Sequence, residues 1–122
     1  MAVGMLERWK KEVPKKAIGL TVKIYKLTAT FPKSEVYGLS SQIQRASVSI
    51  SCNISEGAGK SSRKDFNRFL EMAYGSANEV ENLLIIATEI KYIKEVESSI
   101  YVSDVQEIRK MLNGLMKSLT KY

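Results

Sequence analysis

The sequence predicts an all-α protein, an antiparallel up-down-up-down four-helix bundle, and three observations support this fold class. Apolar residues recur at steps of three and four along most of the chain, the spacing that places them on one face of a helix. The breaks between these periodic segments are short, and short connections make neighbouring helices antiparallel. The chain has 122 residues, enough for one core, so we expect a single domain over residues 1–122.

The first helix is expected at about residues 14–30. Pro14 suits a first helical turn because it has no amide hydrogen to lose there. From it the apolar residues follow at helical spacing: Ala17, Leu20, Ile24, Leu27 and Phe31. Pro32 ends the pattern, since proline disfavours helical geometry in the residue before it. Residues 1–12 precede this helix and are expected to form a separate turn or a flexible arm.

The second helix is expected at about residues 35–57, with Ser34 as its N-cap and Gly57 as a left-handed C-terminal stop. Its apolar line is Leu39, Ile43, Ala46, Ile50 and Ile54. Residues 47–54 also alternate like a strand, but they lie inside this helical line and lack hairpin signals on either side. We therefore interpret the segment as helix.

The third helix is expected at about residues 62–90, because Ser62 followed by Asp65 resembles a capping box. Its apolar line is Phe66, Phe69, Leu70, Ala73, Ala77, Val80, Leu84 and Ala87. The fourth is expected at about residues 97–121, with a heptad of Tyr101, Val105, Ile108, Leu112, Leu115, Leu119 and Tyr122. Alternating steps of four and three predict near-antiparallel packing at about +20°.

A connection centred near residue 60 would set Ala46 opposite residues 73–75 and Ile50 opposite Leu70. Gly75 weakens a helix by about 1 kcal/mol relative to alanine, so we expect a neighbouring backbone to approach it closely. Polar residues on these two helices are expected to bond across the helices or face a partner: Gln42, Asn53, Glu56, Ser76 and Glu79.

Composition excludes most catalytic chemistry. The chain has no histidine and one cysteine, Cys52, so zinc sites, catalytic triads and internal disulfides are not expected. Glu56 and Glu79 are candidate paired carboxylates, but a di-iron bundle needs Glu-x-x-His motifs that are absent. We expect no catalytic residue, metal or cofactor and no small-molecule substrate, hence no enzyme. The longest apolar run is residues 83–87, so we expect no membrane contact and a cytoplasmic location.

Residues 57–62, GAGKSS, resemble the end of a phosphate-binding loop. That motif is G-x-x-x-x-G-K-[ST] between a strand and a helix. Ile54 occupies the position of the first glycine, inside a helical pattern. We therefore interpret the segment as a glycine-rich helix connection, which makes a nucleotide hydrolase the weakest hypothesis.

Positive charge is concentrated in the first half of the chain. Residues 1–64 hold 12 Lys or Arg against 4 Glu, and residues 65–122 hold 7 basic against 9 acidic residues. A basic half favours a polyanion partner, although a merely solvated surface is an alternative. The candidate nucleic-acid-binding residues are Lys11, Lys15, Lys16, Lys23, Lys26, Arg45, Lys60, Arg63, Lys64 and Arg68. Tyr25 is the only aromatic residue near them that could stack on a base, and core packing explains it as well, so binding is expected to be salt-sensitive and poor in sequence choice.

Residues 13–122 resemble the bacterial proteins encoded by intervening sequences in 23S ribosomal RNA genes, also called S23 ribosomal proteins. The matching residues are Phe31-Pro32, Tyr37-Gly38-Leu39, Gln42-Ile43, Arg45-Ala46, Ser49-Ile50, Asn53-Ile54, Glu56-Gly57, Phe66, Arg68-Phe69-Leu70, Ala73, Gly75-Ser76 and Glu79. Pro14 departs from the pattern, because the family often has tryptophan there, whereas Trp9 lies upstream in this chain.

The resemblance implies a four-helix bundle that assembles into a ring-like homopentamer. It also implies a relationship to the accessory variability proteins of diversity-generating retroelements, basic barrels that engage a reverse transcriptase and nucleic acid. The leading hypothesis is therefore a non-enzymatic oligomer that binds nucleic acid, RNA rather than DNA. The alternative is an assembly adaptor for a protein partner such as a reverse transcriptase.

Overall fold

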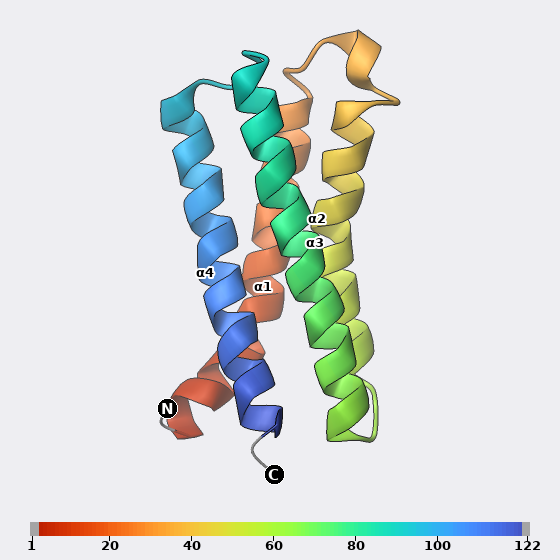
Figure 1. Ribbon diagram of the computed structural model, residues 1–122, viewed down its shortest axis with the longest axis vertical. Helices are drawn as coiled ribbons and strands as arrows, with labels where there is room; N and C mark the ends of the chain where they lie inside the picture. Colours follow the sequence, from red (N-terminus) through yellow and green to blue (C-terminus); the bar gives the residue numbers. More distant parts are fainter. Residues whose placement is uncertain (1–2, 121–122) are drawn as a thin grey trace.

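The computed structural model describes residues 3–120, and these form an all-α four-helix bundle (Figure 1). The helices are α1 (Val3–Thr28), α2 (Leu39–Ala58), α3 (Arg63–Glu89) and α4 (Glu95–Thr120), with a short 3₁₀ helix, η1 (Lys33–Glu35), after α1. Consecutive helices run antiparallel, and α1 and α3 each pack against both α2 and α4. The predicted fold class is confirmed.

The predicted apolar lines supply the core. The largest side chains with almost no exposed surface come from all four helices: Val13, Leu20, Ile24, Ile43, Ile50, Leu70, Val80, Leu84, Val105, Ile108, Leu112 and Leu115. Full burial of one such aliphatic side chain contributes about 1.5–3 kcal/mol. The bundle is therefore held mainly by these four facing stripes.

The predicted start of the first helix is wrong. α1 begins at Val3 and Pro14 lies inside it. The helix continues through the proline because Trp9 and Val13, on the turn before it, are buried against the core. Pro14 has no amide hydrogen to donate to the carbonyl of Lys10, and Figure 1 shows the first turns of α1 leaning away from the rest of the helix. Residues 3–12 are thus helix, while Met1, Ala2, Lys121 and Tyr122 lie outside the described residues.

The second helix also starts later than predicted, at Leu39, and Ser34 is not its cap. Ser34 lies within η1, and the Glu35 side chain takes over the capping role by accepting a hydrogen bond of 3.0 Å from the Leu39 amide. An added Cβ at Gly38 would lie 2.7 Å from Oε1 of Glu35. A side chain at position 38 would therefore displace this carboxylate from its present place.

Glu35 also ties together the two loops at one end of the bundle. Its second oxygen accepts a hydrogen bond of 2.7 Å from the Tyr92 hydroxyl, which lies in the α3–α4 connection. The Tyr92 ring packs against Phe31, with 5.3 Å between ring centroids. The bond to the Leu39 amide, followed by the bond to Tyr92, lowers the pKa of the Glu35 carboxyl, and the bond to Glu35 raises the pKa of Tyr92.

The close approach between α2 and α3 occurs at Gly57, and the expectation of a close approach at Gly75 is wrong. An added Cβ at Gly57 would lie 2.7 Å from Cβ of Phe69 and 3.0 Å from the Phe66 ring, whereas one at Gly75 would meet nothing within 4 Å. Nor is Gly57 a left-handed stop, since no glycine in residues 3–120 has positive φ and α2 runs on to Ala58.

The register of α2 against α3 differs from the expectation by about one turn. The Ser49 and Ser76 hydroxyls share a hydrogen bond of 2.8 Å, so Ser49 rather than Ala46 lies across from the segment around residue 75. Helical side chains lean toward the N-terminus of their own helix. In an antiparallel pair the leanings are opposite, which moves the contacting residues to higher summed numbers than the loop centre alone predicts.

The two glycines allow a matched stability test. Gly57→Ala is expected to destabilise the protein by about 1–3 kcal/mol, because the new methyl group would force Phe69 and Phe66 to shift. Gly75→Ala is expected to stabilise it by about 0.5–1 kcal/mol, because alanine loses less backbone entropy in a helix. Urea unfolding of both variants measures the difference, and equal midpoints would contradict the close contact at Gly57.

The Glu35 network predicts a specific acid sensitivity. Because the pKa of Glu35 is lowered in the folded state, its stabilisation is present above the ordinary carboxyl pKa of about 4.3 and is lost as the pH falls through the lower folded-state value. Urea unfolding between about pH 3 and pH 6 is expected to give a flatter acid limb for Glu35→Gln than for the unmodified chain. Parallel curves of stability against pH for the two proteins would show that Glu35 does not cause the acid sensitivity.

Candidate nucleic-acid interface

The connection between α2 and α3 is a tight helix hairpin. Gly57 is buried in the last turn of α2, and the amides of Gly59 and Lys60 donate to the carbonyls of Glu56 and Gly57 at 3.2 and 3.0 Å. Ser62 caps α3 as predicted, its hydroxyl oxygen accepting a 3.1 Å hydrogen bond from the Asp65 amide. The α3 N-terminus therefore follows directly on the turn.

GAGKSS is not a phosphate-binding loop in this structure. Ile54 is 3% exposed inside α2, so the position that requires a glycine is part of the helical core. The segment before the turn is a helix rather than a strand. The interpretation as a glycine-rich helix connection is confirmed.

Four of the candidate cations gather at this end of the bundle, and we call them the hairpin cations: Lys60, Arg63, Lys64 and Arg68. All four are exposed. Lys60 lies in the turn and the other three lie in the first two turns of α3. The N-terminus of a helix carries partial positive charge, so the dipole of α3 adds to the field of these side chains.

Phe69 positions two of the hairpin cations. The Lys60 ammonium lies 5.3 Å and the Arg68 guanidinium 4.6 Å from the centroid of the Phe69 ring. Cation–π contacts at exposed sites contribute about 0.5–1 kcal/mol each. Because Gly57 lets Phe69 pack tightly on α2, the ring is a fixed platform that favours two long, otherwise freely rotating side chains in one region.

Acidic neighbours offset part of this charge. Lys60 lies 3.4 Å from a carboxylate oxygen of Glu56, and Arg68 lies 3.9 Å from one of Asp65. These pairs are exposed and each is worth between about 0 and 1 kcal/mol, so a phosphate can compete with them. Lys60 and Arg68 can therefore exchange these carboxylates for a phosphate while the Phe69 ring holds them near one another.

The candidate cations of α1 share their side of the helix with apolar residues. Lys11, Lys15 and Lys26 are exposed on the outer side of the helix. The residues that lie between them on this side are apolar and half-exposed, and we call them the α1 stripe: Ile18 (55% exposed), Val22 (49%) and Tyr25 (48%). An apolar row flanked by lysines is more typical of a protein-binding surface than of a phosphate-binding one.

The other candidate cations are dispersed. Lys16 is half-buried, and Lys23 makes a 2.9 Å ion pair with Asp104 of α4. Arg45 is exposed on α2. The structure thus divides the predicted basic half into the hairpin cations and a separate lysine-flanked α1 surface.

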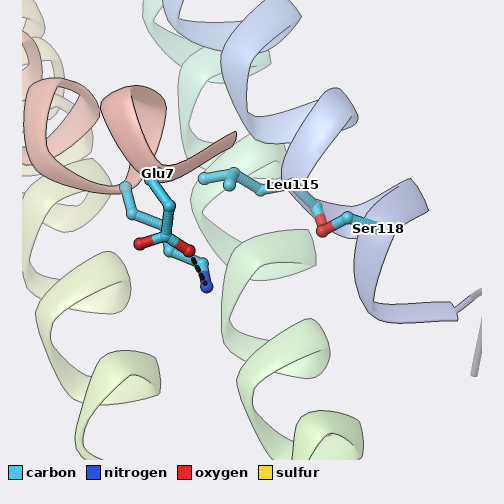
Figure 2. Close-up of polar contacts among 4 residues, drawn as sticks. Glu7, Leu115 and Ser118 are labelled. Atoms are coloured by element: carbon cyan, nitrogen blue, oxygen red, sulfur yellow. Dashed lines mark hydrogen bonds and ion pairs between the residues drawn. The ribbon is translucent and has the colours of Figure 1, made fainter. Parts of the chain in front are cut away.

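Lys10 lies near the hairpin but was not among the candidate cations, because residues 1–12 were not expected to form part of the first helix. Lys10 lines a cavity of about 430 Å³ together with Ala58 and Phe66, which places it near the α2–α3 connection. Lys10 pairs with Glu7 at 3.5 Å and lines the same cavity as Leu115 of α4, and Figure 2 shows Glu7 and Leu115 at this end of the bundle. Trp9 is 7% exposed, so the part of α1 before Pro14 packs on the core. The step of four residues from Trp9 to Val13 could have indicated in the sequence that the helix begins before Pro14.

The structure keeps the candidate carboxylates Glu56 and Glu79 apart. Since Ser49 lies opposite Ser76, Glu56 lies opposite the segment near Phe69, about ten residues or roughly 15 Å along α3 from Glu79. Among residues 3–120 no group of three or more His, Cys, Asp or Glu side chains is placed to hold a metal ion. None of the helices described is long and apolar enough to span a membrane.

Comparison with known proteins agrees with the fold and the motifs. A family model described as 23S rRNA-intervening sequence protein matches residues 10–114. A crystal structure at 1.70 Å resolution, of a protein of unknown function from the S23 ribosomal protein family of Bacteroides thetaiotaomicron VPI-5482, superposes with a TM-score of 0.83 at 29% identity, covering 89% of this chain and 98% of that one. No curated protein matches the chain.

Proposed function

This chain belongs to the 23S rRNA-intervening sequence protein family, and from that premise we propose that it is a non-enzymatic, cytoplasmic, homo-oligomeric protein that binds RNA through the hairpin cations. The family's name ties it to sequences inside ribosomal RNA genes, which supports RNA over DNA. Five copies per assembly is the stoichiometry that the family resemblance implies.

The observation that carries the proposal is the arrangement of the hairpin cations. Lys60 and Arg68 lie over one aromatic ring beside the N-terminus of a helix, and Arg63 and Lys64 lie in its first turn. This arrangement matches the phosphate backbone of a nucleic acid, which is recognised by charge without reading the sequence. In an oligomer the cluster is repeated once per copy, so several weak contacts along one RNA strand add up.

The α1 stripe favours a second candidate function, an assembly adaptor whose main partner is a protein. Ile18, Val22 and Tyr25 are each about half exposed in one row, and such a row is suited to contact with another protein. The family resemblance suggests a reverse transcriptase or another nucleic-acid enzyme as that partner. In this case the hairpin cations contribute little to the function.

Charge reversal at the hairpin tests the leading proposal. Lys60→Glu combined with Arg63→Glu and Lys64→Glu is expected to weaken binding to a generic single-stranded RNA at least tenfold and to reduce the slope of log K against log salt by about 2. Fluorescence anisotropy over a salt series measures both quantities.

The matched control also reverses three exposed lysines, but away from the hairpin, at Lys33, Lys94 and Lys110. This variant is expected to keep the slope and most of the affinity. RNA binding that ignores both salt and the hairpin substitutions would contradict the proposal, as would equal losses in the control.

The adaptor hypothesis makes a different prediction. A protein partner co-purified from the native host would be retained after extensive nuclease treatment and released by Ile18→Glu combined with Val22→Glu, because these side chains lie on the α1 stripe. Affinity purification with mass spectrometry measures the retention. Loss of the partner on nuclease treatment alone would favour RNA as the link.

A further inference from the structure

The cavity of about 430 Å³ lies at the end of the bundle that holds the α2–α3 connection, and all four helices contribute to its wall. Val13, Ile54 and Leu115 supply much of its apolar surface, and each is almost completely buried. Binding sites for small molecules in proteins are about 300–1,000 Å³ in volume and mostly apolar, with a few polar groups that orient the ligand. The cavity therefore has the size and the lining of a binding site.

Two polar groups of the cavity come from the turn of α1 that Pro14 interrupts. Among the described residues that line the cavity Lys10 alone is charged, and its exposed ion pair with Glu7 is weak enough for another anion to replace the carboxylate. Because Pro14 has no amide hydrogen, the carbonyl of Lys10 lacks the donor that residue i+4 of a helix normally supplies. This carbonyl lies between two residues that line the cavity. The wall thus offers a cation to an anionic group and a carbonyl oxygen to an N–H donor.

Phe66 gives the cavity an aromatic surface beside the hairpin cations. Its ring is packed on α2, since an added Cβ at Gly57 would lie 3.0 Å from it. Phe66 follows Arg63 by three residues on α3, and Ala58, which also lines the cavity, precedes Lys60 by two residues. A strand whose phosphates lie on the hairpin cations therefore passes close to the cavity.

We propose that this cavity receives one unpaired base of the RNA strand that the hairpin cations hold. The inference rests on the proposed function and adds to it a contact that depends on a base as well as on phosphates. A base has a flat ring that can stack on Phe66, N–H groups at its edge for the Lys10 carbonyl, and a phosphate next to it for the Lys10 ammonium. A fatty acid offers no N–H donor, and inorganic phosphate offers no apolar surface, so each matches only part of this lining.

Fluorescence anisotropy on the full chain tests the base site with two ligands of equal charge. One is a short single-stranded RNA, and the other is the same sugar-phosphate strand without bases. The unmodified chain is expected to bind the strand with bases at least about fivefold more tightly, because stacking of one base on an aromatic side chain contributes on that order. A contact made by phosphates alone would give equal affinities for the two strands.

A variant that fills the cavity locates the base contact. Ser55 and Ala58 are exposed on α2 and line the cavity, so Ser55→Leu combined with Ala58→Leu is expected to close its opening. This variant should bind both strands with the affinity of the strand without bases and should keep the salt dependence, because every hairpin cation is retained. The matched control is Gln42→Leu combined with Cys52→Leu, since these residues are also exposed on α2 but do not line the cavity. The control should keep the preference for bases, and circular dichroism verifies that both variants remain helical.

The outcomes separate this inference from the proposed function. Equal binding of the two strands, with both released by salt and by the charge reversal at Lys60, Arg63 and Lys64, overturns the base site and leaves RNA binding by the hairpin cations intact. A preference for bases that survives Ser55→Leu with Ala58→Leu, or that the control variant loses to the same extent, also overturns the assignment to this cavity. Failure of both strands to bind overturns the inference and the proposed function together.

Discussion

The contact between Gly57 and Phe69 is the constraint on which the rest of the structure depends. The missing side chain at Gly57 lets Phe69 and Phe66 pack against the last turn of α2, and this closes the central hairpin at its loop end. The same contact fixes the ring over which Lys60 and Arg68 lie. The contact between Gly57 and Phe69 thus sets both the register of α2 against α3 and the position of the charges that we propose bind RNA. A larger residue at position 57 would disturb both at once.

The opposite end of the bundle is closed by different chemistry. There the Glu35 carboxylate accepts from the Leu39 amide and the Tyr92 hydroxyl, and it joins the loop after α1 to the loop after α3. Hydrogen bonds to an ionised carboxylate are stronger than those between neutral groups. This end of the bundle therefore depends on pH, whereas the hairpin end is held by apolar packing. The two ends differ in charge as well, because the hairpin cations gather at the packed end.

Local signals predicted what local physics controls. The apolar lines and the Ser62 cap were correct because spacing and capping act within a few residues. Pro14, Ser34 and Gly75 were misread because their outcome depends on how the helices and η1 pack, which residue type and spacing do not give. Burial of Trp9 and Val13 carries α1 through a proline, Glu35 replaces Ser34 as the cap, and Gly75 lies in open space.

The hairpin cations were predictable as a group from their sequence positions. Their placement around Phe69 and the apolar character of the α1 stripe required the packed helices.

The two groups of basic residues need not compete for one role. If RNA covered the α1 stripe, the lysines beside it would lose part of their hydration. The phosphate backbone would also give the half-exposed isoleucine and valine side chains no apolar contact. Lys60 and Arg68 lie over the Phe69 ring, and all four hairpin cations lie in or beside the α2–α3 turn, at one end of the bundle rather than on its sides. Assembly through the sides would therefore leave the hairpin ends exposed and would repeat them at regular intervals. Each copy contributes its four hairpin cations, so the oligomer presents a multivalent surface. Multivalency raises the affinity of weak phosphate contacts.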